Sequence, residues 1–475
     1  MDAKVGSIIN DVAIMGAGIA GLTAGQTLTT AGRAVEILES SDHIGGLATT
    51  MEHEGFRFDL GGHRFVTDDP SLEAYVRNIL GDDCLTVPRS SKILLRQRYF
   101  DYPLRPLNAM FGFGAVTTAR ILADYVRERL RPVFGRQAVS LEDWVISHFG
   151  RTMFELYFRD YSEKVWGIDC SHIDQAWIEQ RIQGLSLGAA IKKALLPRRG
   201  RDLPTLATHF LYPRLGIGQI AENLAVQIRP HNLIHTGARV TRVNHSGASI
   251  DSLEVIQAGR HRMVAAGQFI STIPLPVLVN ALRPHPPAEV IAAATRLRSR
   301  DLVTVAIMVN RPRVTEETWI YVPEKTIPFG RIHEPTNWSR YMAPEGQSLL
   351  VTEYFCFRGD AVWDGSDKTL AARTIDSLVR LGIIKPQEVI GHVVQRIANA
   401  YPLFEVGYNE DCRTIYAYLR RFSNLYTAGR NGMFRYYNMD HAMQAGMDAA
   451  HNILQAYQPT SAHTLVGTTL AKASA

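Results

Sequence analysis

The sequence contains little cysteine and no pattern of metal ligands. Its 475 residues include only 4 cysteines, at positions 84, 170, 356 and 412. None of them forms a C-x-x-C pair, and His172, His231 and His235 show no metal-ligand spacing. No metal site and no thioredoxin-like site is therefore predicted. Isolated thiols are typical of proteins in the reducing cytoplasm.

Long apolar runs and a large excess of charge are also missing. We find no run of about 18 apolar residues, which argues against a membrane-spanning helix, and the N-terminus has no apolar signal core. The net charge of +5 is too small to indicate a nucleic-acid partner. It suits an anionic ligand or an anionic membrane surface. We expect a cytoplasmic protein and interpret the basic stretch Lys192–Arg201 as a solvated connector, with peripheral contact to the inner face of the membrane as the alternative.

A glycine-rich turn near the N-terminus is the strongest local pattern. It follows an expected strand at Asp11–Met15 and opens a helix that runs to about Thr30, and a second strand, Ala34–Leu38, comes next. This order of strand, turn, helix and strand is a βαβ unit. In such a unit the helix N-terminus faces bound phosphates with its partial positive charge.

Each glycine of the turn has a separate physical role. Gly16 allows the tight turn, Gly18 lets the backbone approach a pyrophosphate, and Gly21 lets helix and sheet pack closely. Glu39 ends the second strand, where its carboxylate can accept hydrogen bonds from an adenosine ribose. The unit therefore predicts a dinucleotide site.

Two further glycine pairs indicate which dinucleotide is bound. Gly45-Gly46 precedes Leu47, and Gly61-Gly62 precedes His63; a second close pass of backbone along the cofactor favours such pairs. The combination resembles the flavoprotein superfamily of amine oxidases, protoporphyrinogen oxidases and UDP-galactopyranose mutases. The resemblance implies FAD, with NAD as the competing interpretation. It also implies an α/β fold in which a Rossmann-like FAD-binding domain carries an inserted substrate domain of mixed helices and β-sheet.

The remaining periodicity gives the expected organisation. A helical pattern runs from about Ser71 to Gly150 and over 152–183. Strands are expected near 233–244, 252–256, 264–272, 302–310, 348–357 and 424–428, and a helix from about Asp440 to Leu454. The first and last strand–helix units are similar, so we expect them in one sheet. The FAD-binding domain is predicted at 8–92, 205–285 and 400–457, the substrate domain at 93–204 and 286–399, and a disordered tail at 458–475.

The segment YSEKVWGIDCSHIDQAWIEQRI resembles a stretch of the UDP-galactopyranose mutases, chiefly of the eukaryotic type. It contains Trp166, Trp177 and Arg181. Arg181 stands four residues after Trp177 and so shares its helix face. The tryptophan could stack on a ligand and the arginine could pair with a phosphate. The alternative is a core aromatic helix with a surface arginine.

Two later segments also resemble the mutases. In PFGRIHEPTNWS, Arg331 corresponds to an arginine that contacts the substrate pyrophosphate, and Asn337 and Trp338 follow; a surface-loop arginine is the alternative. In TAGRNGMFRYYNMDHA, Arg430 corresponds to an arginine between flavin and sugar diphosphate, and Tyr436 or Tyr437 to a tyrosine that contacts phosphate. A guanidinium fork matches phosphate oxygens. The alternative is an internal ion pair with Asp440 or another carboxylate.

The resemblance assigns roles to three sets of residues. The predicted catalytic residues are His63, Arg331 and Arg430. The predicted cofactor contacts are Gly16, Gly18, Gly21, Glu39, Gly45, Gly46, Leu47, Gly61, Gly62, His63, Val240, Gly429, Arg430, Asp440, His441 and Ala442. The predicted substrate contacts are Trp166, Trp177, Arg181, Arg331, Asn337, Trp338, Arg430, Tyr436 and Tyr437. His63 either lies beside the isoalloxazine and responds to its redox state, or is satisfied by backbone groups.

The same resemblance implies redox-neutral chemistry on a nucleotide sugar, in polysaccharide or glycoconjugate synthesis. N5 of reduced FAD would be the nucleophile, which explains why no protein nucleophile is evident. An external donor such as NAD(P)H would reduce the flavin. The alternative is a true FAD-dependent oxidoreductase that acts on amines, protoporphyrinogen or isoprenoid-like substrates, because one fold hosts both chemistries. A non-catalytic FAD-binding scaffold is the third hypothesis.

Overall fold

The computed structural model describes residues 10–102, 114–130, 138–181 and 208–457, and of residues 115 and 179–181 only the backbone. The stretch Lys192–Arg201 and the tail 458–475 lie outside the described residues. Within the described part, no helix is long and apolar enough to cross a membrane. The same part contains no group of three or more His, Cys, Asp or Glu side chains that could hold a metal ion.

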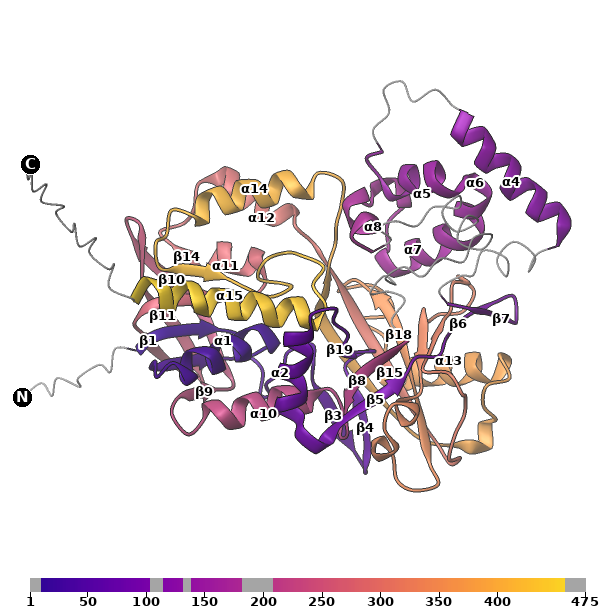
Figure 1. Ribbon diagram of the computed structural model, residues 1–475, viewed down its shortest axis with the longest axis horizontal. Coiled ribbons are helices and arrows are strands. Elements are labelled where there is room, and N and C mark those ends of the chain that lie inside the picture. Colours follow the sequence, from indigo (N-terminus) through magenta and orange to yellow (C-terminus); the bar gives the residue numbers. More distant parts are fainter. Residues whose placement is uncertain (1–9, 103–113, 131–137, 182–207, 458–475) are drawn as a thin grey trace, which may run out of the picture.

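A five-stranded parallel sheet forms the core of the half that lies on the left of Figure 1. Its order is β20-β13-β1-β2-β9, and every neighbouring pair is parallel. The strands are β1 (Asn10–Met15), β2 (Val35–Leu38), β9 (Leu233–His235), β13 (Ala266–Ser271) and β20 (Leu425–Thr427). The first and last strand–helix units therefore share one sheet, as predicted, with β13 between them.

The two faces of this sheet are covered differently. Val12 and Ile14 pack with helices α1 (Ile19–Thr30) and α10 (Gly218–Ile228), whereas Ala13 and Met15 pack with strands of a second sheet. Side chains alternate along a strand, so β1 is apolar on both sides. The second sheet has the order β12-β11-β10-β14 and comprises β10 (Ala238–Ser246), β11 (Ser249–Gln257), β12 (Arg260–Val264) and β14 (Leu282–Arg283).

Glycines allow the helices to approach one another closely on the first face. A Cβ at Gly446 of α15 (Met439–Tyr457) would lie 2.2 Å from the Ala20 carbonyl oxygen of α1. A Cβ at Gly21 would lie 2.0 Å from the Gly16 carbonyl oxygen. Gly21 thus permits the close packing that the sequence predicted for it.

A seven-stranded sheet forms the other half, on the right of Figure 1. Its order is β19-β15-β18-β17-β16-β6-β7. The strands are β6 (Ser91–Leu95), β7 (Arg98–Asp101), β15 (Ser299–Val309), β16 (Trp319–Tyr321), β17 (Arg331–His333), β18 (Ser348–Cys356) and β19 (Val389–Pro402). One face packs on α13 (Asp367–Arg380), and the opposite face joins the core that contains α1.

The prediction of continuous helix from Ser71 to Gly150 is wrong over residues 84–101. After α2 (Pro70–Leu80), the chain forms β5 (Cys84–Pro88), β6 and β7. Arg96 and Gln97 have φ angles of 52° and 60° and join β6 to β7 in a tight turn. Pairing of β6 with β16 decides the outcome, and that partner lies more than two hundred residues away, where periodicity cannot reveal it.

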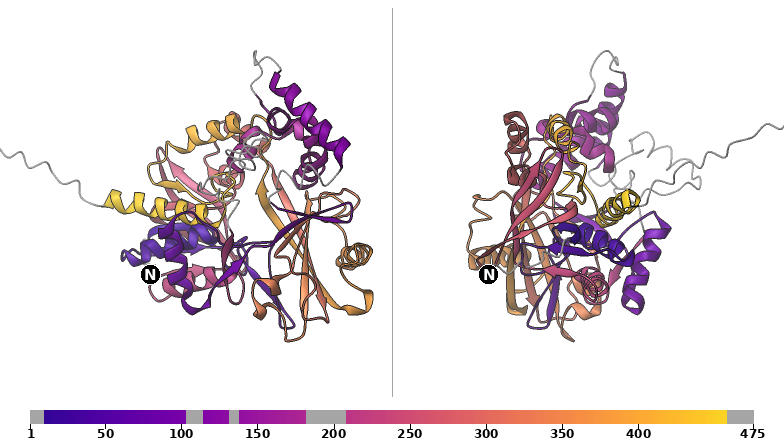
Figure 2. Two further views of the ribbon diagram at one scale, coloured as in Figure 1. Left: turned by 45° about the vertical axis from the view of Figure 1, so that its right-hand side comes forward. Right: turned by 90° about the vertical axis from the view of Figure 1, so that its left-hand side faces the viewer.

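A group of helices stands beside the seven-stranded sheet, as both views of Figure 2 show. It comprises α4 (Ala115–Leu130), α5 (Leu141–Phe149), α6 (Arg151–Met153), a π-helical turn (Phe154–Phe158), α7 (Arg159–Trp166) and α8 (Gln175–Arg181). Of the stretch predicted as helical, 152–183, residues 152–166 and 175–181 are helical, a turn that contains a short 3-10 segment separates them, and residues 182 and 183 lie outside the described residues. The division into domains remains a prediction; its boundaries at 92/93 and 399/400 fall inside β6 and β19.

The remaining elements connect or cover these layers. They include the hairpin β3 (Thr50–His53) and β4 (Phe56–Asp59), strand β8 (His209–Pro213) paired with β5, and helices α11 (Leu275–Ala281), α12 (Ala288–Arg296) and α14 (Tyr408–Leu419). Asp59 ties β4 to the segment after β8: it accepts hydrogen bonds from Thr50 Oγ1 (2.6 Å), Tyr212 Oη (2.7 Å) and Ile217 N (3.1 Å).

Candidate functional site

Two glycine turns lie against each other at the carboxyl end of the parallel sheet. Gly16, with φ of 103°, donates its N–H to the Leu38 carbonyl (2.8 Å). Gly45 donates to the Ala17 carbonyl (2.8 Å) and pairs with Gly18 in a β-bridge. A Cβ at Gly46 would lie 3.3 Å from Gly18 Cα. Backbone contacts alone therefore join the predicted pyrophosphate turn to the second glycine pair.

The start of α1 fits a dinucleotide phosphate. Its first turn has no acidic residue and no side-chain cap, so its N–H groups face outward without a competing carboxylate. A Cβ at Gly18 would meet no protein atom within 4 Å. Glu39 ends the next strand and accepts hydrogen bonds from Ala17 N (2.8 Å) and Ser41 N (2.9 Å). The turn, the helix start and the carboxylate are thus held in the arrangement that an FAD pyrophosphate and ribose require.

The other predicted cofactor residues gather around this end. Gly429, with φ of 81°, follows β20, and a Cβ there would lie 3.0 Å from Ala20 Cβ at the start of α1. Asp440, His441 and Ala442 form the first turn of α15. Val240 lies on β10, which begins with a hydrogen bond from Ala238 N to the Glu39 carbonyl (2.7 Å), and Leu47 is half-buried beside the second glycine pair.

The third glycine turn packs directly on the seven-stranded sheet. Gly61 has a φ of 109°, and Gly62 donates its N–H to Glu353 Oε1 on β18 (2.9 Å). A Cβ at Gly62 would lie 1.6 Å from the Trp319 ring. The turn therefore links the FAD-binding sheet to the sheet that carries the predicted arginine.

Arg331 lies on β17 and is buried, with 11% of its side chain exposed. Its Nε donates to Tyr161 Oη (2.9 Å), and its Nη1 donates to Glu353 Oε2 (3.0 Å) and Tyr401 Oη (3.2 Å). The burial excludes the alternative of a surface-loop arginine. Glu353 is fully buried, so this ion pair compensates the guanidinium charge while holding its position.

Arg430 has partners of a different kind. Its Nε donates to the Tyr437 carbonyl (2.7 Å) and its Nη1 to the Ala400 carbonyl (3.1 Å). Among the described residues no carboxylate lies within ion-pair distance of Arg430. Asp440 instead contacts His441 (3.0 Å), so the alternative of an Arg430–Asp440 ion pair is wrong. Arg430 is therefore a half-buried positive charge whose hydrogen bonds go to backbone carbonyls.

Tyr401 brings the two arginines together. Its ring centroid lies 5.4 Å from Arg430 Cζ and 6.0 Å from Arg331 Cζ. Tyr436 stacks on Tyr401 at 6.2 Å and lies 5.2 Å from Arg430 Cζ. Positive charges over aromatic faces are stabilised by the ring quadrupole. Two guanidiniums, one on β17 and one after β20, thus converge on one pair of tyrosines.

Trp166 joins the same aromatic cluster. It is almost completely buried and lies edge-to-face with Trp177 (5.2 Å), Tyr401 (6.4 Å) and Tyr436 (6.5 Å). Arg181 ends α8, but its side chain lies outside the described part. Lys164, two residues before Trp166, donates its Nζ to the carbonyls of Val322 (2.8 Å) and Glu324 (2.7 Å). Burial lowers the Lys164 pKa to about 7.

His63 lies between the third glycine turn and the arginine pair. Burial lowers the pKa of His63 to about 4, and the nearby charges of Arg430 and Arg331 act in the same direction. The imidazole is therefore neutral at neutral pH. In this form it can accept a proton only under acidic conditions, and its redox-responsive role remains a prediction.

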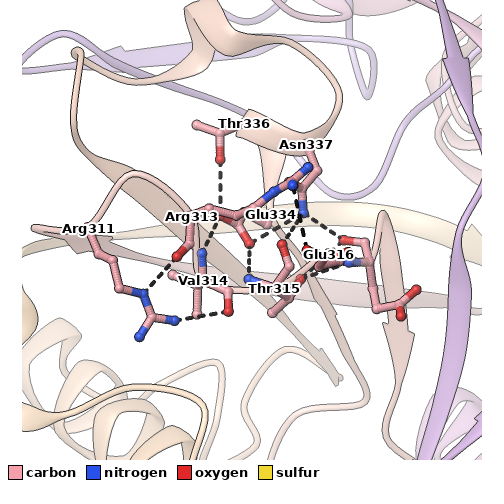
Figure 3. A network of polar contacts seen from close by, with 9 residues as sticks. Arg311, Arg313, Val314, Thr315, Glu316, Glu334, Thr336 and Asn337 are labelled. Atoms are coloured by element: carbon pink, nitrogen blue, oxygen red, sulfur yellow. Dashed lines mark hydrogen bonds and ion pairs between the residues drawn. The ribbon is translucent and has the colours of Figure 1, made fainter.

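Asn337 and Trp338 belong to a different network (Figure 3). Asn337 Nδ2 donates to the carbonyls of Thr315 and Glu317 (3.0 Å each), and its Oδ1 accepts from Arg313 Nε (2.9 Å). Buried Glu334 accepts from Val314 N (2.8 Å) in the same network. These bonds occupy the Asn337 amide. Trp338 Nε1 donates to the Thr318 carbonyl (3.0 Å) and its ring is buried, so both residues hold the loop, and their contact with a substrate stays a prediction.

Tyr437 helps to hold Arg430 in position. Its carbonyl accepts the Arg430 hydrogen bond, and its ring stacks on His441 at 5.7 Å. Tyr436, by contrast, faces Tyr401. The structure thus separates the two tyrosines between which the sequence could not choose.

Sequence reasoning missed Tyr161, Glu353, Tyr401 and Asp301. Glu353 left a signal, because it is the one charged residue of strand β18, SLLVTEYFC. Asp301 left none: its Oδ1 accepts from Asn399 N (2.7 Å), at a bulge where β15 and β19 change register. Asn399 has a φ of 54°, and the bulge directs the Ala400 carbonyl to Arg430 and the Tyr401 ring between the arginines.

The parallel sheet, its glycine turns and the uncapped helix start define a dinucleotide-binding flavoprotein. The family model for flavin containing amine oxidoreductase matches residues 19–454. The chain therefore belongs to this family and is a FAD-dependent enzyme. The FAD prediction and the predicted fold class are confirmed, and the chain resembles the superfamily that the sequence indicated.

Individual relatives fall into both branches of that superfamily. The chain is 23% identical to the chloroplastic protoporphyrinogen oxidase of Nicotiana tabacum over 85% of its length and 78% of the relative. It is 24% identical to a probable UDP-galactopyranose mutase of Klebsiella pneumoniae over 34% of its length and 42% of that protein. A crystal structure of reduced UDP-galactopyranose mutase has the same fold, with a TM-score of 0.81 at 23% identity, over 95% of this chain and 96% of that one.

Proposed function

We propose that this enzyme binds the diphosphate of a nucleotide sugar through Arg430 and Arg331 and catalyses a redox-neutral mutase reaction on the sugar. The observation that carries the proposal is Arg430, a guanidinium that no described carboxylate neutralises and that converges with Arg331 on Tyr401. A half-buried positive charge without a counter-ion favours an anionic ligand.

The two arginines have different roles in the proposal. Arg331 is compensated by Glu353 and held by Tyr161 and Tyr401, so it positions the cluster and adds hydrogen bonds to an anion that arrives. Arg430 supplies the uncompensated charge. Its backbone partners fix the guanidinium without neutralising it, which is the arrangement that stabilises a developing negative charge.

The aromatic residues and His63 complete the anion site. Tyr401 and Tyr436 present stacked rings that a sugar or base can cover. His63 is neutral, so it adds no charge that would attract the diphosphate away from the arginines. A diphosphate that leaves the sugar would stay beside Arg430, ready to recombine with it. Bound and reduced, FAD supplies the nucleophile at N5, as the resemblance to the mutases implies.

The test is titration of the reduced protein with UDP, GDP and dTDP sugars, together with turnover of each. We expect one of them to bind and Arg430→Gln to weaken that binding about tenfold to a hundredfold, because hydrogen bonds to charged groups are worth about 1.5–3 kcal/mol. The matched control is Arg435→Gln, since Arg435 is exposed in the same loop and should leave binding unchanged. Equal binding by wild type and Arg430→Gln, with FAD retained, would contradict the proposal.

A second function is supported by the relatives. Protoporphyrinogen oxidases of plants match along most of the chain, and the family model describes amine oxidoreductases. An FAD-dependent oxidoreductase would reduce oxygen or a quinone when an amine, porphyrinogen or polyene substrate is added. It would also show no response of the flavin spectrum to nucleotide sugars. These two readouts separate it from the mutase.

The cellular setting follows from the proposed chemistry. A mutase of this kind would supply an altered sugar ring to enzymes of polysaccharide or glycoconjugate synthesis and would need an external reductant such as NAD(P)H to keep its flavin reduced. Both requirements are met in the cytoplasm, where nucleotide sugars and reduced nicotinamides coexist.

A further inference from the structure

Helix α4 is fixed to the protein by one face. Ile121 is fully buried and packs with Ile93, Phe100, Met153 and Tyr157. On the same side, Asp124 accepts a hydrogen bond from Thr152 N (3.1 Å). The helix is thus anchored by both apolar and polar contacts. Because this face points to the protein, the opposite face of the helix is exposed.

The opposite face of α4 is apolar and exposed. Val116 is 72% exposed, Val126 52% and Leu130 77%, and Leu122 reaches 37%. At 100° per residue these side chains fall within an arc of about 120°. The small exposed residues Ala119 and Ala123 lie in the same arc. Figure 1 places α4 at the outer end of the helical group, away from the FAD-binding sheet. A continuous apolar stripe on an anchored helix indicates an interaction surface.

Arginines flank the stripe. Arg120 and Arg127 lie along one edge and Arg129 along the other, and all three are exposed. The acids of the helix, Asp124 and Glu128, lie outside the arc and are half-buried. An apolar face bordered by cationic side chains is the pattern of a helix that lies in the plane of a membrane interface. Anionic lipid headgroups would contact the arginines while the apolar face enters the acyl boundary.

We propose that α4 docks the enzyme on an anionic membrane surface through Val116, Leu122, Val126 and Leu130, with Arg120, Arg127 and Arg129 on lipid headgroups. A second copy of the chain is a weaker candidate for this face. Two-fold contact of α4 with α4 would bring the arginine edges of both copies together, and like charges repel. The proposal is independent of the function proposed above, because none of these residues belongs to the arginine–tyrosine cluster.

The experiment is co-sedimentation of the full-length holoenzyme with vesicles of phosphatidylglycerol and phosphatidylcholine, and with vesicles of phosphatidylcholine alone. The test variants are Val126→Glu and the double variant Arg120→Glu/Arg127→Glu. Helix α10 offers matched controls, because Val226 is 64% exposed and Arg229 is exposed at the end of that helix. The controls are therefore Val226→Glu and Arg229→Glu. Thermal melting and gel filtration without lipid accompany each variant.

We expect the wild type and both controls to bind the anionic vesicles, and high salt to weaken that binding. Each test variant should bind about tenfold less or weaker still, since an exposed valine and a pair of basic residues each contribute that much at an interface. Equal binding by wild type and Val126→Glu would overturn the proposal, as would the absence of wild-type binding. A dimer that Val126→Glu dissociates would assign the face to a second copy. If both test variants melt at a lower temperature and the wild type does not bind vesicles, another part of this chain covers the apolar face of α4, and the proposal is overturned.

Discussion

The cofactor end and the arginine end of this site are built by different means. Around Gly16, Gly18 and Gly45 the contacts are between backbone groups; positive φ angles and close approaches explain Gly16 and Gly45, and the open space at Gly18 suits the predicted pyrophosphate. Around Arg331 and Arg430 the contacts are made by two charged side chains with a carboxylate, aromatic rings and backbone carbonyls of β18, β19 and the segment after β20. The first end depends on space, whereas the second depends on compensation of buried charge.

The difference has an energetic consequence. At the cofactor end, a methyl group added by a glycine-to-alanine change disturbs only the ligand or the packing next to that residue. At the arginine end, loss of one partner leaves another charge buried and unpaired, which costs far more than the pair contributes. Gly62 links the two ends, because its N–H donates to Glu353 and its missing side chain makes room for Trp319.

The largest effect on stability is expected for Glu353→Gln. Glu353 is fully buried and compensates Arg331, so its neutralisation should lower the free energy of unfolding by about 3–5 kcal/mol. The control is Glu405→Gln, which removes an ion pair with the exposed Arg298 and should cost at most about 1 kcal/mol. Urea denaturation measures both. Similar losses for the two variants would show that the arginine end is no more sensitive than the surface.

The next largest effect concerns Asp59 and pH. Burial raises the pKa of Asp59 to about 7, although three hydrogen bonds oppose the shift. A carboxyl with a raised pKa in the folded state contributes stability below its unfolded pKa, and this contribution is lost as the pH rises through the folded pKa. Compared with Asp59→Asn, the wild type should therefore lose up to about 4 kcal/mol between about pH 4 and pH 7.

The measurement for Asp59 is the difference in unfolding free energy between the two proteins at a series of pH values. The difference, and not either absolute curve, isolates this carboxyl from the other titrating groups. Parallel curves from pH 4 to pH 7 would mean that Asp59 ionises in the folded protein at an ordinary pKa.

Gly62→Ala tests the junction between the two ends. Its methyl group would overlap the Trp319 ring, so we expect a loss of about 1–3 kcal/mol from overpacking. The double variant with Trp319→Phe should recover part of this loss, because a smaller ring leaves room for the methyl group. If the double variant is less stable than the sum of the two single changes predicts, the Trp319 ring does not limit the space at Gly62.

The smallest effect on stability is expected for Gly18→Ala. A Cβ there meets no protein atom within 4 Å and the φ angle is −72°, so the apoprotein should change by about 0.5 kcal/mol or less. FAD affinity should nevertheless fall about tenfold or more, because the methyl group occupies the approach to the pyrophosphate. Flavin fluorescence titration of the apoprotein measures the affinity. Unchanged affinity would place the pyrophosphate elsewhere.

Much of the fold could be read from local patterns. The βαβ unit, the strands at residues 249–257, 299–309 and 348–356 and the C-terminal helix agree with expectation within a few residues, because each has a regular apolar period and a turn signal beside it. The strands at 84–101 could not be predicted, because they depend on pairing with β16 and β8.

The site shows the same division. Glycine reports a backbone requirement directly, so the cofactor turns were evident in the sequence. Asn337 shows the limit of a loop pattern, because an asparagine in a loop has the same appearance whether its amide faces a ligand or, as in this structure, three neighbouring backbone and side-chain groups. Arg430 was predicted to bind an anionic ligand, with an ion pair to Asp440 or another carboxylate as the alternative, and in the structure Asp440 contacts His441.

The sequence by itself determined the dinucleotide turn, the flavoprotein class and the presence of arginines at two distant positions. Glycine spacing and apolar period act over a few residues, where the chain has few alternatives. Only the tertiary structure decided that Glu353 neutralises Arg331 and that the bulge at Asp301 turns Tyr401 between the arginines. It also decided that no carboxylate of the described residues pairs with Arg430. Compensation of charge depends on which groups meet across separate elements, such as Arg331 on β17 with Glu353 on β18 and Tyr161 on α7, and chain folding alone brings them within hydrogen-bond distance.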